Sequence, residues 1–203
     1  MLPKMPIPPE GRTTLPRLLL HCCCAPCSTH VITILRPSFD LACYFYNPNI
    51  QPTEEHERRL AEMQRLAARL TIPLTIPCYD PESWLKAVTG HELEPEGGPR
   101  CLICYRLRLD NTARHAAGAG LPWFASTLSI SPHKNAQAIN TIGQEIAASL
   151  GLNFHAADFK KKDGFKSSLQ LSKQHGLYRQ TYCGCRFSER PQALAASQGA
   201  SSL

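Results

Sequence analysis

Short apolar runs alternate with helical patterns along most of this chain, and that alternation restricts the folds open to it. Apolar runs of strand length cover residues 17–22, 38–47, 73–80, 123–129 and 153–158. Patterns that predict helices cover residues 53–70, 81–90, 102–117 and 134–151, and another helix is expected to begin near Pro26. We therefore expect an α/β domain with a mainly parallel five-stranded sheet and helices on both faces, a Rossmann-like three-layer arrangement.

The chain has 203 residues, enough for one domain with a sizeable core. We expect a single α/β domain over residues 17–190 that carries the functional site. The proline-rich head (1–16) and the tail (191–203) lack apolar periodicity and are predicted to be flexible. The head has no signal-peptide pattern, and no stretch approaches the roughly 18 apolar residues of a membrane span. The sequence therefore predicts a cytoplasmic protein without a membrane partner.

A polar or cysteine-rich cluster follows each of the five predicted strands. In chain order the clusters are HCCCAPC (21–27), YNPNI (46–50), Tyr79-Asp80, STLSISPHKN (126–135) and ADFKKKDG (157–164). The carboxyl ends of parallel strands meet at one edge of a sheet, and ligands bind there near the point where the strand order reverses. The five clusters therefore predict one site at this edge.

Ten cysteines in a chain expected to stay in a reducing compartment indicate metal or redox chemistry, not a disulfide framework. Cys43 and Cys78 fall inside predicted strands, and we interpret both as small buried hydrophobic residues. The other eight form three groups, at 21–27, 100–106 and 182–185. The net charge of +6 adds a weak preference for an anionic partner.

The spacing within these groups favours a shared centre without identifying it. Cys24 and Cys27 form one CxxC pair, Cys101 and Cys104 form another, and the glycine between Cys183 and Cys185 permits a tight turn. A CxxC pair alone is compatible with zinc, an iron–sulfur cluster or a dithiol redox pair. A structural zinc knot that only ties loops together is the simplest alternative.

Eight candidate thiols are more than one centre needs, since an all-thiolate zinc site or a four-iron cluster uses four. The side chains of adjacent residues in a strand diverge, so we expect Cys23 and Cys24 to face different partners. The surplus therefore indicates two neighbouring centres, or one centre beside a reactive thiol.

Six motifs, in this order along the chain, resemble those of the epoxyqueuosine reductases of the QueH type. They are HCCCAPCS, YFYNPNIQPTEEHERR, EPEGGPRCLICYRLRL, STLSISPHKNAQAIN, DFKKKDG and LYRQTYCGC. The resemblance runs from about Leu18 to Ser188 and leaves out only the two tails.

This resemblance implies an oxidoreductase that converts epoxyqueuosine to queuosine at the wobble position of tRNA without cobalamin. It also implies a [4Fe-4S] cluster, a second mononuclear metal expected to be iron, a tRNA anticodon stem-loop as substrate and an electron donor that the sequence does not identify. The implied fold is akin to that of the adenine nucleotide alpha hydrolases. Those proteins hold phosphate on a glycine-serine loop after the first strand, where this chain has HCCCAPCS, so nucleotide hydrolysis is not implied.

The resemblance also carries residue roles, which we transfer position by position. The expected metal and cluster ligands are Cys23, Cys24, Cys27, Cys101, Cys104, Cys183 and Cys185, whereas Cys22 is the expected spare. Cys23 is also a candidate for the reactive thiol. A carboxylate, either Asp80 or Asp158, is a candidate for completing the second site, although a helix cap or a loop hydrogen bond explains each equally well.

Candidate proton donors and nucleic-acid contacts follow from the same motifs. His133, Lys134 and Tyr182 are candidate proton donors, with a surface hydrogen-bonding role favoured for His133, and His21 is expected to be a buried, satisfied histidine. The aromatic rings that are candidates for stacking on bases are those of Tyr44, Tyr46, Trp84, Tyr178 and Tyr182. Packing in the hydrophobic core is the alternative interpretation for each of them. Candidate phosphate contacts are Arg106, Arg108, Arg114, Lys160, Lys161, Lys162 and Lys166.

Two other classes of function compete with the reductase. One is a zinc-dependent nucleic-acid-binding module without catalysis, and the other is a thiol–disulfide oxidoreductase built on a CxxC pair. Bound iron separates the reductase from both.

Overall fold

The computed structural model describes residues 15–188. The flexible head and tail expected from the sequence therefore lie almost wholly outside the described residues. No helix within residues 15–188 is both long and apolar enough to cross a membrane.

Within residues 15–188, five parallel strands form one sheet in the order β3-β2-β1-β4-β5. Their bounds are β1 Arg17–His21, β2 Asp40–Tyr44, β3 Leu74–Thr75, β4 Trp123–Ser126 and β5 Asn153–Phe154. In the central strand, Leu20 pairs with Cys43 of β2 and with Ala125 of β4. The strand order reverses between β1 and β4, and this is the switch point where parallel α/β sheets bind ligands.

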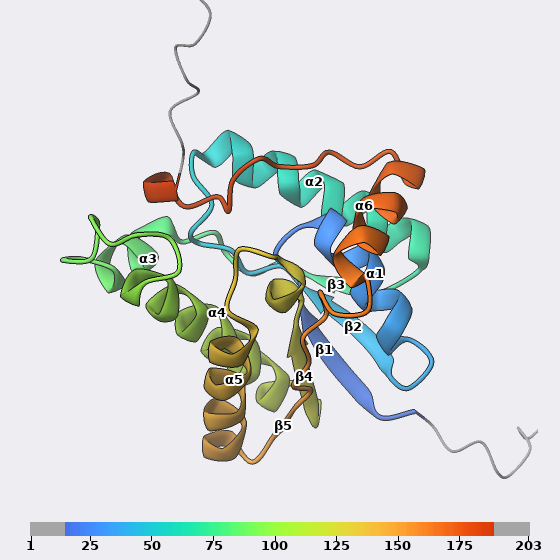
Figure 1. Cartoon of the computed structure of the whole chain (residues 1–203). Coiled ribbons are helices and arrows are strands. Elements are labelled where there is room, and N and C mark those ends of the chain that lie inside the picture. The colour runs from blue at the N-terminus through green and yellow to red at the C-terminus, as the bar shows by residue number, and fades with distance from the viewer. Residues whose placement is uncertain (1–14, 189–203) are drawn as a thin grey trace, which may run out of the picture.

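Helices cover both faces of the sheet, which confirms the predicted three-layer arrangement (Figure 1). They are α1 Ala25–Leu35, α2 Thr53–Leu70, α3 Pro81–Ala87, α4 Pro99–Gly118, α5 Ala136–Leu150 and α6 Gly164–Gln174, with 3-10 turns η1 Thr127–Ile130 and η2 Arg186–Ser188. Successive residues of a strand point to opposite faces. Leu18 and Leu20 accordingly pack in the core beneath α1 and α2, whereas Leu19 packs in the core beneath α4 and α5.

The two edge strands are much shorter than predicted. Residues 73–80 were expected to form a strand, but only Leu74 and Thr75 pair with β2. Pro73 and Pro77 flank this pair and lack the N–H groups that a longer ladder needs. Cys78 lies beyond the strand and is exposed, so its interpretation as a buried hydrophobic residue is wrong. Cys43 is fully buried, as expected.

Helix α6 was not predicted from the sequence. Its buried positions are Gly164, Ser168 and Ser172, so the side that packs on α1 carries small residues and gives no apolar stripe. A Cβ atom at Gly164 would lie 1.9 Å from the carbonyl oxygen of Phe159, which requires glycine there. Small residues thus allow close packing that hydrophobic periodicity does not detect.

Candidate metal centre

A cleft of about 1050 Å³ opens at the switch point of the sheet. Cys23 and Cys27 line it from the β1–α1 junction, and His133 and Lys134 line it from the loop after η1. Other lining residues come from α2, α4, α6 and the segment 179–188. The structure therefore places the predicted site at the expected edge, around the ends of β1 and β4.

The thiols of Cys23, Cys24 and Cys27, which we call the α1 thiols, converge at the start of α1. Their three Sγ atoms lie within 4.8 Å of one another, and those of Cys23 and Cys24 are 3.9 Å apart. Tetrahedral thiolate sites with metal–sulfur bonds of about 2.3 Å place their sulfurs roughly 3.8 Å apart. The α1 thiols therefore form a group that can hold a metal ion.

This convergence contradicts the expectation that Cys23 and Cys24 face different partners. Alternation of side chains holds in a regular strand, but β1 ends at His21 and the chain turns after it. Cys24 is the N-cap of α1, in extended conformation, and Pro26 occupies the first turn as predicted. The turn into the helix brings both sulfurs to the same side.

Hydrogen bonds among the α1 thiols give the three groups different pKa values. Hydrogen bonds with the thiols of Cys24 and Cys27 hold the pKa of Cys23 well below the usual thiol value. Burial, together with the neighbouring Cys23, raises the pKa of Cys24 to about 12. Thr127 also donates to the Cys23 sulfur, at 3.2 Å between Oγ1 and Sγ. Cys23 is therefore the most acidic thiol of the three.

The other four candidate ligands, Cys101, Cys104, Cys183 and Cys185, form a looser assembly that we call the four-thiol group. Cys101 and Cys104 lie in the first turns of α4, which begins at Pro99, earlier than predicted. Cys104 and Cys185 share a small buried cluster with Trp84, and Cys183 packs against it. Burial raises the pKa of Cys101, and the charges of Cys104 and Cys183 add to this effect. All four thiols thus belong to one neighbourhood.

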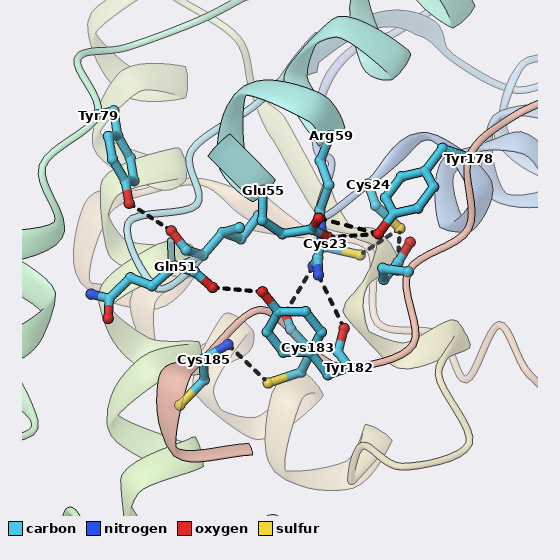
Figure 2. A network of polar contacts seen from close by, with 12 residues as sticks. Cys23, Cys24, Gln51, Glu55, Arg59, Tyr79, Tyr178, Tyr182, Cys183 and Cys185 are labelled. Carbon is cyan, nitrogen blue, oxygen red and sulfur yellow. Dashed lines mark hydrogen bonds and ion pairs between the residues drawn. The ribbon is translucent and has the colours of Figure 1, made fainter. Parts of the chain in front are cut away.

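Cys183 and Cys185 reach this neighbourhood because helix α2 holds their segment in place (Figure 2). The guanidinium of Arg59 donates to the carbonyl oxygens of Tyr182 and Cys183, at 3.2 and 3.1 Å. Its Nε also donates to Glu55 at 2.6 Å. Arg59 is only 2 % exposed, so these bonds are shielded from water. A buried arginine therefore links the segment that carries the two cysteines to a distant helix.

Gly184 completes the turn between these two cysteines, as the sequence predicts. Its φ of +102° is a conformation that side chains disfavour. A Cβ atom there would lie 2.8 Å from Ile50 and 3.0 Å from Arg59. In this turn the Cys185 N–H donates to the Cys183 sulfur at 3.4 Å. A hydrogen bond from the Cys185 thiol holds the pKa of Cys183 well below its usual value.

Buried N–H groups without acceptors gather around the four-thiol group. Within residues 15–188, Trp84 Nε1, Arg100 Nε and Arg108 Nε have no hydrogen-bond partner. Such groups are costly unless an acceptor is present. A sulfide- and thiolate-bearing centre supplies acceptors of this kind. The donor set and these N–H groups therefore both fit an iron–sulfur cluster in this neighbourhood.

Lys134 lies close to both cysteine groups. Burial alone would lower its pKa, but negative charge on Cys183 and Cys23 outweighs burial and raises it. His133, the second candidate proton donor, is exposed at the rim of the cleft. The hydroxyl of Tyr182, the third, donates to the carbonyl oxygen of Gln51 at 2.6 Å. All three line the cleft.

The remaining candidate residues have other hydrogen-bond or ion-pair partners. Asp80 caps α3, where its carboxylate accepts from the N–H and the hydroxyl of Ser83. Asp158 forms an ion pair with Lys160 at 3.2 Å. The Cys22 thiol is fully buried and donates to the carbonyl oxygen of Leu20. His21 is buried and satisfied, as expected, because Ser126 and the carbonyl of Tyr46 are its hydrogen-bond partners.

Several candidate nucleic-acid contacts are in the core instead. Tyr44, Tyr46 and Trp84 are buried, as the alternative interpretation expects. Arg108 is buried too, and it lines the cleft instead of the outer surface. Arg106 and Arg108 are two residues apart on α4, and side chains two apart point to different sides of a helix.

The other basic candidates remain on the surface. Arg106 and Arg114 are exposed and pair with Glu145 and Asp110. Lys161, Lys162 and Lys166 are exposed and take no part in ion pairs within residues 15–188.

A parallel α/β domain with cysteine thiols gathered at its switch point fits the class of metal-binding or redox proteins. A family model described as epoxyqueuosine reductase QueH matches residues 18–191. The chain therefore belongs to the QueH family of epoxyqueuosine reductases.

Individual relatives agree with this assignment. The chain is 38% identical over 191 residues to an epoxyqueuosine reductase QueH of Streptococcus pyogenes serotype M1, an alignment that covers 91% of this chain and 75% of the relative. It is 41% identical over 177 residues to the QueH of Acinetobacter baylyi, covering 86% and 81%. It is 39% identical over 176 residues to the QueH of Dehalococcoides mccartyi, covering 86% and 93%.

Proposed function

We propose that this protein reduces epoxyqueuosine to queuosine in the anticodon loop of tRNA. The observation that carries the proposal is the pair of cysteine groups at the switch-point cleft, in a chain of the QueH family. The epoxide takes up two electrons and two protons, the two C–O bonds break, an alkene forms and the oxygen leaves as water. The proposal includes an electron donor of a kind still to be identified, and it needs no cobalamin.

The two cysteine groups differ in a way that supports two kinds of centre. The α1 thiols lie within 4.8 Å of one another, which suits one metal ion. The four-thiol group is looser and offers the four thiolates that a [4Fe-4S] cluster uses. We assign the cluster to the four-thiol group and a single iron to the α1 thiols. When bound, the cluster supplies single electrons and the iron supplies a Lewis acid.

Residues of the chain then position the substrate and supply protons. Lys134 Nζ carries a proton that the nearby thiolates hold in place, and it lies at the cleft beside Cys23 and Cys183. Arg179 packs over the ring of Phe165, with 5.2 Å to the ring centroid, and both line the cleft. Together with Tyr182 they offer surfaces on which an unpaired base can stack.

Phosphate contacts are proposed for the exposed Lys161, Lys162 and Lys166 beside the cleft. Replacing all three with glutamine should weaken binding of an anticodon stem-loop and make the remaining affinity less dependent on salt. The measurement is a titration of binding against salt concentration. An unchanged salt dependence would show that these lysines do not contact the phosphates of the stem-loop.

The reaction itself is tested by nucleoside mass spectrometry of tRNA. Cells whose only epoxyqueuosine reductase is the Cys104→Ala variant should accumulate epoxyqueuosine, whereas cells with the Cys78→Ala variant should make normal queuosine. Cys78 is the matched control because its thiol is exposed and outside both groups. Normal queuosine in the Cys104→Ala cells would refute the proposed function.

Metal analysis separates the proposal from its two rivals. Anaerobically purified protein should be brown and contain more iron than one cluster accounts for. Colourless protein that takes up only zinc would favour a zinc-binding module. Activity that persists after chelation would favour a dithiol oxidoreductase.

A further inference from the structure

Arg108 is a buried cation to which residues 15–188 offer no carboxylate. Its side chain projects from α4 and is 3 % exposed. None of the ion pairs formed within this part of the chain includes it, and its Nε has no hydrogen-bond partner. An unpaired charge inside a protein is unfavourable unless an anion or strong acceptors offset it. The fold therefore holds a positive charge in a place that requires a negative one.

The sulfur atoms of both cysteine groups are the neighbours that can carry this negative charge. Arg108 Nη1 lies 4.0 Å from the Sγ of Cys104, one turn earlier on the same helix. The guanidinium also lines the cleft onto which Cys23 and Cys183 open. A positive charge at this position therefore acts on both groups through a poorly solvated interior, where such interactions are strong.

Asn47 fixes the position of this charge. Its side-chain oxygen accepts a hydrogen bond from Arg108 Nη2, and its Nδ2 donates to the carbonyl oxygen of Cys22 at 2.9 Å. Asn47 is itself 1 % exposed. A buried amide thus ties the guanidinium to the end of β1, directly before the α1 thiols. This anchoring separates Arg108 from a mobile surface arginine.

We propose that Arg108 is the counter-charge of the cysteine-bound cluster and sets its reduction potential. Reduction adds an electron to a centre already surrounded by thiolates, and a fixed cation beside it stabilises that added charge. Arg108 is a positioning and tuning residue in this assignment, and it need not touch the substrate. The inference rests on the proposed cluster in the four-thiol group.

The chain contains its own control for this charge. Arg106 lies on the same helix, two residues earlier, but is exposed and paired with Glu145. Replacing Arg106 or Arg108 with glutamine removes the same charge from the same helix. The two changes differ in burial, in proximity to the cysteines and in the partner that the guanidinium loses.

The test is the midpoint potential of the cluster in the full-length, anaerobically reconstituted protein, followed by electron paramagnetic resonance during a redox titration. We expect Arg108→Gln to shift the potential to more negative values. Arg108→Lys should recover part of the shift because it keeps the charge. Arg106→Gln should leave the potential unchanged.

Each outcome either supports or overturns the role proposed for Arg108. A cluster-loaded Arg108→Gln protein with the parent potential overturns the inference, as does an equal shift in Arg106→Gln. If Arg108→Gln does not fold, Asn47→Ala replaces it, because that change keeps the charge but releases its anchor; an unchanged potential there also overturns the inference. Failure of the parent protein to bind any cluster refutes the proposed function instead.

Discussion

The α1 thiols and the four-thiol group are built in different ways. The first comes entirely from residues 23–27, where one strand turns into one helix. The second joins the start of α4 to the segment around Gly184, and that segment reaches it through hydrogen bonds from Arg59 on α2. Local geometry fixes one group, whereas long-range contacts fix the other. Damage to α2 should therefore affect the four-thiol group and spare the α1 thiols.

The largest effect is expected for Arg59→Met. The change leaves Glu55 without its buried partner and frees the carbonyls of Tyr182 and Cys183. Breaking such a buried pair lowers the free energy of unfolding by about 3–5 kcal/mol. Denaturant titration of the metal-free protein measures this, and iron analysis should show loss of the cluster.

Arg65→Met is the matched control for Arg59. Arg65 lies on the same helix and also pairs with a glutamate, but its side chain is 59% exposed. An exposed pair contributes about 0–1 kcal/mol. Equal losses in the two variants would contradict the role given to Arg59.

A smaller effect is expected for Gly184→Ala. The positive φ costs on the order of 1–3 kcal/mol for a residue with a side chain, and the added Cβ would also press on Ile50 and Arg59. Gly176→Ala isolates the backbone term, because Gly176 has a φ of +62° and open space around it. Cluster content should fall in Gly184→Ala only. The same cluster content in both variants would show that the turn does not position Cys183.

Tyr178→Phe should have a modest effect. The Tyr178 hydroxyl donates to both carboxylate oxygens of Glu55, at 3.1 and 3.3 Å. Loss of this partly buried bond is expected to lower the free energy of unfolding by about 1 kcal/mol. Denaturant titration checks the value, and cluster content should remain near that of the parent. A loss as large as that of Arg59→Met would mean that Glu55, not Arg59, organises the segment.

A further effect, seen only below neutral pH, is a dependence of stability on pH through His56 of α2. Burial, with a further contribution from Arg59, lowers the pKa of His56 to about 4. The unfolded chain binds a proton near pH 6.5 and the folded protein does not, so this histidine's contribution to stability is lost as pH falls from about 6.5 towards 4. His56→Phe should make the free energy of unfolding less dependent on pH over this range. An identical profile in the variant would exclude His56 as the source.

The same contrast explains which features the sequence could predict. The α1 thiols follow a buried strand and precede Pro26, so local signals placed them at the switch point. Their convergence was missed, because alternation along a strand does not extend into a helix N-cap. The partnership of Arg59 with Cys183 joins residues 124 positions apart and leaves no local pattern. Helix α6 was missed because small residues form its packing side.

Arg108 is a second feature that the sequence alone does not predict. Its place in a basic helix with Arg106 and Arg114 predicts a phosphate contact. Only the packing of α4 against the sheet distinguishes the buried arginine from the two exposed ones. Family motifs predicted the seven cysteines as one set of ligands, and the three-dimensional arrangement separates them into two groups.

Mössbauer spectroscopy of isotopically enriched Cys27→Ala and Cys104→Ala proteins tests the central claim that the two groups hold different centres. We expect Cys104→Ala to lose the four-iron signal and keep the single-iron signal, and Cys27→Ala to do the reverse. A Cys27→Ala protein that loses the four-iron cluster, beside a Cys104→Ala protein that keeps it, would contradict the account.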